Sequence, residues 1–81
     1  MLSVSYSRDA FRALTRMPPQ YRRSVRAAVD EVDTLIHTSE PLSDGCYVNS
    51  LDVGLRLIYS QTDDQVIVLA ISGYDGPLGG H

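Results

Sequence analysis

The sequence has few of the residues from which disulfides and metal centres are built. Cys46 is the only cysteine, so no internal disulfide can form. The sequence has no Cys-x-x-Cys motif, and its two histidines do not stand at ligand spacing, so we expect no metal site and no small-molecule cofactor. Cys46 itself begins an expected strand and is most simply a small buried hydrophobic residue.

Long apolar runs are also missing. No segment is apolar over the length that a membrane-spanning helix needs, and the first residues do not have the pattern of a signal peptide. We therefore expect a cytoplasmic protein that does not enter a membrane. With 81 residues, of which 43% are hydrophobic and 21% charged, the chain predicts one globular domain over residues 1–81 with a small core.

Lysine is absent, and the arginines are unevenly distributed. Residues 1–26 contain six arginines and one acid, Asp9, whereas residues 27–81 contain Arg56 alone and nine acids. The net charge of −3 conceals this asymmetry. Arginine is well suited to bidentate contacts with phosphate or carboxylate groups, but a lysine-free chain can equally reflect a GC-rich genome. The composition leaves both explanations open.

The first half of the chain predicts a short strand and two helices. Val4 and Tyr6 alternate with serines, as in a strand. Ser7 or Asp9 can cap the helix that follows, and Pro18-Pro19 ends it. This first helix places apolar residues on one face: Ala10, Phe11, Leu14 and Met17.

The second helix has the clearest periodicity. Its apolar residues recur at spacings of three and four over about 18 residues, which is typical of an amphipathic helix. They are Tyr21, Val25, Ala28, Val29, Val32, Leu35 and Ile36. The segment Thr38-Ser39-Glu40-Pro41 ends this pattern, and residues 42–45 are expected to form a loop.

Three strands are expected in the second half, over residues 46–51, 55–60 and 66–72. The third is almost continuously apolar, which favours a central place in the sheet. Residues 73–81 contain four glycines and a proline and are expected to form an irregular tail. The order β-α-α-β-β-β predicts a two-layer α+β domain, with an α-hairpin packed on a four-stranded, mainly antiparallel sheet. We expect a core that includes Phe11, Leu14, Val25, Val29, Val32, Leu57, Val68 and Ala70.

One arginine stands inside a predicted strand. In Gly54-Leu55-Arg56-Leu57-Ile58-Tyr59, the alternation places Leu55, Leu57 and Tyr59 on one face and Arg56 on the other. A guanidinium on a sheet face is costly unless it reaches solvent or an anion. Arg56 therefore either extends to solvent, pairs with an acid such as Asp52 or Asp75, or binds a negatively charged ligand.

The order of elements and several segments resemble the RelE/ParE superfamily of toxins from type II toxin–antitoxin systems. Gly45-Cys46-Tyr47 resembles the opening of the family's second strand, and residues 54–59 resemble its G-Y-R-[LV]-[VI]-Y segment. Residues 63–71 resemble the acidic turn and apolar strand that follow. The RelE branch of this superfamily cleaves mRNA in the ribosomal A site. The resemblance implies a ribosome-dependent endoribonuclease that is neutralised by a cognate acidic antitoxin, with the ribosome and mRNA as further partners.

The resemblance carries over only part of the catalytic set. Arg56 matches a catalytic arginine that would hold the scissile phosphate. Val48 and Ser50 stand where RelE has lysines, and Gly73-Tyr74-Asp75 replaces a Gly-[His/Lys]-Arg segment. The loss of three cations should reduce catalysis about 10³-fold or more, so we expect weak or lost cleavage.

Other positions keep two interpretations. Tyr74 and His81 lie where the family keeps its catalytic tail, but they could equally be a core-edge tyrosine and a terminal histidine. The arginines of both helices could bind RNA or an acidic antitoxin, or they could form a solvated helix face. They are Arg8, Arg12, Arg16, Arg22, Arg23 and Arg26. A ParE-like toxin that binds DNA gyrase without catalysis, and a catalytically dead interaction module, are the alternative functions.

Overall fold

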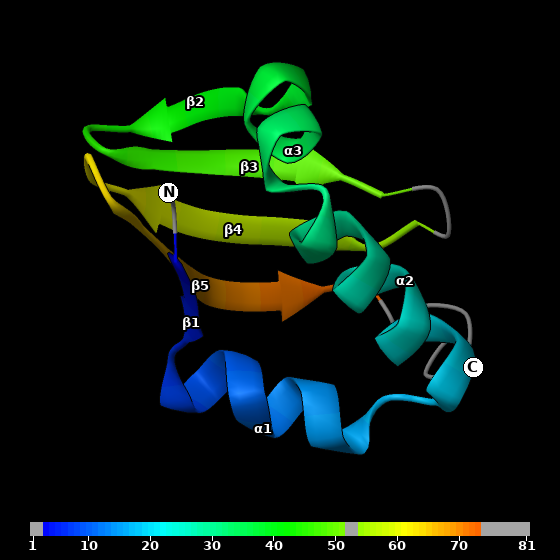
Figure 1. Cartoon of the computed structure of the whole chain (residues 1–81). Coiled ribbons are helices and arrows are strands. Elements are labelled where there is room, and N and C mark those ends of the chain that lie inside the picture. The colour runs from blue at the N-terminus through cyan, green and yellow to red at the C-terminus, as the bar shows by residue number, and fades with distance from the viewer. Residues whose placement is uncertain (1–2, 52–53, 74–81) are drawn as a thin grey trace.

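Helices cover one face of a mixed sheet, as the α+β prediction requires (Figure 1). The computed structural model describes residues 3–51 and 54–73. Along this part of the chain the elements are β1 (Ser3–Tyr6), α1 (Arg8–Arg16), α2 (Pro19–Asp30), α3 (Val32–Thr38), β2 (Glu40–Ser43), β3 (Cys46–Ser50), β4 (Arg56–Gln61) and β5 (Gln65–Ser72).

Within the described residues the sheet has five strands in the order β1-β5-β4-β3-β2, whereas the sequence predicted four. β1 is parallel to β5, and the other neighbouring pairs are antiparallel. The additional strand is β2, which occupies part of the region expected to be a loop. Pro41 has no N–H to donate, and a proline is tolerated at a sheet edge, where β2 lies. All four residues of β2 are exposed, so the strand has no alternation of apolar and polar residues from which it could be predicted.

The long second helix predicted from periodicity is divided into α2 and α3 at Glu31. This residue has φ −104° and ψ 55°, and its N–H donates to the carbonyls of Ala27 and Ala28. The helix direction changes there, so that α3 lies over β3 (Figure 1). An interruption of one residue barely disturbs the apolar spacing, which explains why periodicity alone predicted a continuous helix.

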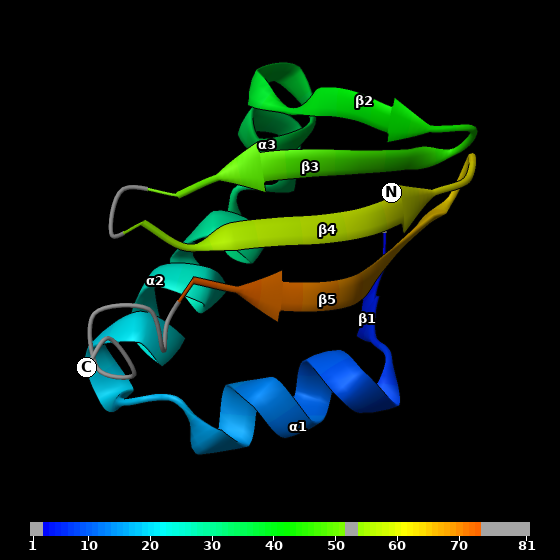
Figure 2. The same cartoon turned by 180° about the vertical axis from the view of Figure 1, so that it is seen from behind.

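The first helix also differs from the expected α-hairpin. α1 packs mainly against β5 at the lower border of the sheet, instead of lying along α2 (Figures 1 and 2). Its start agrees with the predicted cap, because the Ser7 hydroxyl accepts a hydrogen bond from the Ala10 N–H at 3.1 Å. Pro18 precedes α2 and Pro19 is its first residue, as expected of prolines at a helix start.

The core lies between the helices and the sheet. Its buried residues are Ala10, Met17, Val25, Leu35, Leu55, Leu57, Tyr59, Val66, Val68 and Ile71. Three predicted core residues are confirmed as buried: Val25, Leu57 and Val68. Leu14, Val29 and Val32 are partly buried and pack against this core.

Two core predictions are wrong. Phe11 is 59% exposed, because Ala10 and Met17 define the inward face of α1 and the neighbouring position points outward. Ala70 is only partly buried, because β5 contains a bulge: Ile58 pairs with Ala70, but Tyr59 pairs with Val68. The extra residue changes the alternation, so that the inward residue after Val68 is Ile71.

Candidate functional site

Arg56 lies on the face of the sheet that the helices leave uncovered. Leu55, Leu57 and Tyr59 are fully buried on the helix side, whereas Arg56 between them is exposed. Figure 2 shows the strands from this side, with the helices behind them. The predicted division of this strand into two faces is therefore confirmed, and the guanidinium reaches solvent.

The neighbouring strands place a hydroxyl on each side of this arginine. Arg56 pairs with Ser50 of β3 and with Ser72 of β5, and directly paired residues share a face of the sheet. All three residues are exposed. This row offers one guanidinium and two hydroxyl donors to an anion.

The next row of the same face is apolar. Ile58 pairs with Val48 on one side and with Ala70 on the other, and all three are partly buried. Neither this row nor the serine–arginine row contains a histidine, a lysine or a carboxylate. These two rows can therefore bind an anion beside an apolar surface, but they contribute no general acid or base.

The remaining catalytic candidates lie outside the described residues. Tyr74 and His81 fall there, as do Asp52 and Asp75, the acids considered as partners of Arg56. The contribution of the expected tail to a catalytic centre therefore stays a prediction.

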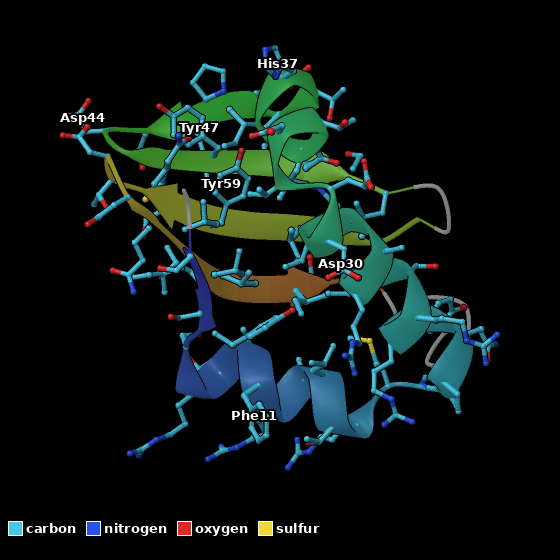
Figure 3. All side chains as sticks on the ribbon, viewed as in Figure 1. Phe11, Asp30, His37, Asp44, Tyr47 and Tyr59 are labelled. Carbon is cyan, nitrogen blue, oxygen red and sulfur yellow. The ribbon has the colours of Figure 1, made fainter. Side chains whose placement is uncertain are left out.

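The six arginines of the N-terminal third are placed on the helices, away from Arg56. Arg8, Arg12 and Arg16 are exposed on α1, and Arg23 and Arg26 are exposed on α2. Arg22 is partly buried. Figure 3 shows nitrogen-tipped side chains that project from α1 away from the sheet, on the side where Phe11 also projects. We call the six residues the arginine surface. Because the sheet separates the helical side from the face that carries Arg56, the structure does not combine them into one site.

A hollow of about 300 Å³ opens beside the arginine surface, between β1, α1 and α2. Burial raises the pKa of Tyr6 in this hollow; the Arg26 charge opposes that rise and Asp30 adds to it. The hollow combines apolar side chains with one residue of each charge. It is lined by Val4, Tyr6, Phe11, Leu14, Arg26, Val29 and Asp30.

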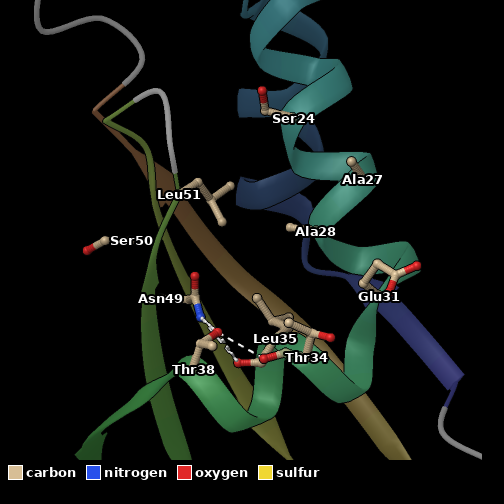
Figure 4. A pocket seen from close by; sticks show the side chains of 10 residues that line it. All are labelled: Ser24, Ala27, Ala28, Glu31, Thr34, Leu35, Thr38, Asn49, Ser50 and Leu51. Carbon is tan, nitrogen blue, oxygen red and sulfur yellow. Dashed lines mark hydrogen bonds between the residues drawn. The ribbon is translucent and has the colours of Figure 1, made fainter.

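Sequence reasoning missed a second, larger pocket of about 500 Å³ on the helical side, between α2, α3 and the end of β3 (Figure 4). At its base lies Asn49, the one buried polar residue of the described chain, with 6% of its surface exposed. A signal was present, because Asn49 shares the inward positions of its strand with Tyr47 and Leu51. A polar residue at such a position needs partners, and here they come from α3 and the residue after it.

Tyr59 contains an unpartnered buried hydroxyl. Its ring stacks on Tyr47, with centroids 5.6 Å apart and the planes inclined by 27°. Burial raises the pKa of Tyr59; the Ser39 side chain partly opposes this rise, and Tyr47 adds to it. The approach of Ser39 falls short of hydrogen-bond geometry, and the Tyr59 hydroxyl has no hydrogen-bond partner among the described residues.

Comparisons with known proteins add no relative, since no family model, curated protein or solved structure matches the chain. Two further findings concern the described residues alone. They contain no group of three or more potential metal ligands. None of their helices is long and apolar enough to cross a membrane.

Proposed function

We propose that this protein is a RelE-like toxin of a type II toxin–antitoxin system that acts on ribosome-bound mRNA, with weak or lost cleavage. The observation that carries the proposal is the position of Arg56. It is exposed on the uncovered sheet face, where a phosphate can approach it together with the hydroxyls of Ser50 and Ser72. A guanidinium with two hydroxyl donors suits a phosphodiester.

Weak catalysis follows from what surrounds Arg56. Cleavage through a 2′-hydroxyl requires proton transfers and stabilisation of a crowded phosphate, and each lost donor costs about 10²-fold or more. Val48 and Ser50 supply no cation on the neighbouring strand. A single arginine supports binding of the phosphate far better than it supports the complete reaction.

The arginine surface supports a second part of the proposal, an acidic protein partner. Arg8, Arg12 and Arg16 stand one turn apart on α1, and like charges at this spacing are unfavourable unless a partner neutralises them. A cognate antitoxin with an acidic segment would do so. A small acidic reading frame next to the gene would support this assignment.

The deciding experiment is inducible expression without the antitoxin, with growth measured and mRNA 5′ ends mapped. We expect a growth defect that Arg56→Ala abolishes, while the melting temperature stays close to that of the wild type because Arg56 is exposed. In this strain without antitoxin, Arg23→Ala is the matched control, since it also removes an exposed arginine, but from the helical side of the domain. Strong A-site cleavage that survives Arg56→Ala would contradict the proposal.

One observation favours a non-enzymatic alternative, a ParE-like toxin or an interaction module. The apolar row of Val48, Ile58 and Ala70 lies beside Arg56 and is only partly buried, as in a protein-binding surface. Toxicity without new mRNA 5′ ends, together with inhibited supercoiling by purified gyrase, would favour the ParE-like function. Absence of any growth defect would favour the interaction module.

A further inference from the structure

The hollow between β1, α1 and α2 combines apolar walls with one charge of each sign. The side chains of Val4, Leu14 and Val29 and the rings of Tyr6 and Phe11 form its apolar part. Phe11 is 59% exposed although its side chain is large and apolar. An apolar group that covers these walls would remove exposed apolar surface from water, which is favourable.

The size of the hollow, about 300 Å³, favours a small molecule. Ligand pockets in proteins extend from about 300 to 1,000 Å³, and this hollow lies at the small end of that range. It can hold one apolar side chain together with a few polar atoms.

The two charges of the hollow come from neighbouring positions of α2. Arg26 and Asp30 stand four residues apart, so their Cβ atoms lie about 5–6 Å from each other on one side of the helix. Both residues are exposed, and no ion pair or hydrogen bond among the described residues engages either side chain. Burial raises the pKa of Tyr6, Arg26 lowers it and Asp30 raises it, so both charges lie near the Tyr6 hydroxyl.

The carboxylate of Asp30 decides which ligands fit. A purely anionic ligand would be attracted by Arg26 but repelled by Asp30, and a purely cationic ligand would meet the reverse. Asp30 is also the last residue of α2, where the helix dipole favours a cation. A ligand that carries both charges is attracted by both residues, and an α-amino acid has this form because its ammonium and carboxylate groups are bonded to one carbon atom.

We propose that the hollow binds a free α-amino acid with an apolar side chain, its carboxylate on Arg26, its ammonium on Asp30 and its side chain against the apolar walls. The Tyr6 hydroxyl can donate to the carboxylate of the ligand. The site goes beyond the function proposed above, since it requires neither Arg56 nor an antitoxin. It uses one of the six residues of the arginine surface.

NMR titration of the complete chain with four small probes tests the ligand class. The probes are leucine, leucinamide without the carboxylate charge, N-acetyl-leucine without the ammonium charge, and glycine without the alkyl group. Leucine should cause saturable shifts at the backbone amides of Tyr6, Leu14, Arg26 and Val29. Leucinamide and N-acetyl-leucine should each bind about twofold to fivefold more weakly, as expected for the loss of one exposed ion pair, and glycine about tenfold more weakly.

Two variants assign the charges, since both residues are exposed and can change without unfolding the domain. Arg26→Gln should abolish the preference for leucine over leucinamide and keep the preference over N-acetyl-leucine, and Asp30→Asn should do the opposite. Arg12→Gln and Asp33→Asn are the matched controls, because each removes an exposed charge that does not line the hollow. Both preferences should persist in the controls.

The apolar wall has its own pair of variants. Phe11→Ala should weaken leucine binding about threefold or more, whereas Leu42→Ala, which removes the other large exposed apolar side chain of the described residues, should leave it unchanged. Equal affinity for leucine, leucinamide and N-acetyl-leucine, or no saturable shift at these amides, would overturn the proposal. An acetylated and amidated Glu-Leu-Glu peptide that binds more tightly than leucine would also overturn it and would assign the hollow to an acidic partner protein.

Discussion

The unpartnered Tyr59 hydroxyl allows a sharp test of the packing described above. Tyr59→Phe removes one oxygen from a fully buried side chain and leaves the ring stacked on Tyr47. A buried polar group without a partner lowers the free energy of unfolding by about 1–3 kcal/mol, so its removal should stabilise the protein. The small void that the missing oxygen leaves offsets part of this stabilisation. We therefore expect Tyr59→Phe to raise the free energy of unfolding by about 0.5–1.5 kcal/mol.

The assay is equilibrium unfolding in urea, with the m-value required to stay constant so that the change reflects stability alone. For a domain of this size, a gain of about 1 kcal/mol raises the melting temperature by roughly 4–8 °C. Tyr47→Phe is the matched control, because Tyr47 is only partly buried on the neighbouring strand, and it should change stability by less than about 0.5 kcal/mol.

A loss of more than about 1 kcal/mol in Tyr59→Phe would refute the reasoning, because it would show that the hydroxyl is hydrogen-bonded. A double-mutant cycle with Ser39→Ala would then identify the partner. A coupling energy near zero would identify water as the hydrogen-bond partner of the Tyr59 hydroxyl. A coupling energy above about 0.5 kcal/mol would identify the Ser39 hydroxyl as that partner.

Three further predictions concern the backbone, the helical surface and alkaline pH. Gly73→Ala should lower the free energy of unfolding by about 1 kcal/mol or more beyond the loss in Gly54→Ala, as measured by urea unfolding. Both glycines have positive φ, but only a Cβ at Gly73 would meet a backbone oxygen, at 2.5 Å, so equal losses would contradict this prediction. Reversal of Arg12, Arg16 and Arg23 to glutamate should weaken antitoxin binding at low salt without lowering the melting temperature, and unchanged affinity would exclude the arginine surface as its site. Because the pKa of Tyr59 is higher in the folded protein than the unfolded value of 10.0, the stability that depends on the protonated hydroxyl is complete below pH 10.0. As the pH rises from 10.0 toward the pKa of the folded protein, the free energy of unfolding falls by up to about 1.4 kcal/mol per pH unit. Tyr59→Phe should flatten this alkaline decline in stability, which urea unfolding at a series of pH values measures.

Much of the fold could be predicted because the local signals agree with the tertiary structure. The serine cap of α1, the prolines before α2 and the alternation around Arg56 each depend on near neighbours in the sequence, and the structure shows all three. The division of the Arg56 strand into two faces followed from period two alone, but the sequence left open whether Arg56 extends to solvent, pairs with an acid or binds an anion.

The wrong predictions arise where distant segments decide the local structure. Ala70 is not a core residue because β5 has a bulge opposite β4, and no residue of β5 indicates the bulge in the sequence. The break at Glu31 similarly leaves the apolar spacing intact. The pocket escaped sequence reasoning because Asn49 meets groups 10 to 14 residues earlier in the chain, which only folding brings to it.

The parallel pairing of β1 with β5 has a consequence for how the chain matures on the ribosome. β1 pairs with β5, and just after β1 the Ser7 hydroxyl donates to the Leu69 carbonyl, 62 positions later in the sequence. β1 therefore has no partner strand until almost the whole described chain has been synthesised. At about 5–20 residues per second, synthesis of the intervening segment takes roughly 3–12 s, far longer than hairpin formation. During that interval the nascent chain carries an open strand and an undocked α1. A message truncated before β5 would therefore yield a polypeptide in which β1 has no strand to pair with and α1 has no strand to pack on.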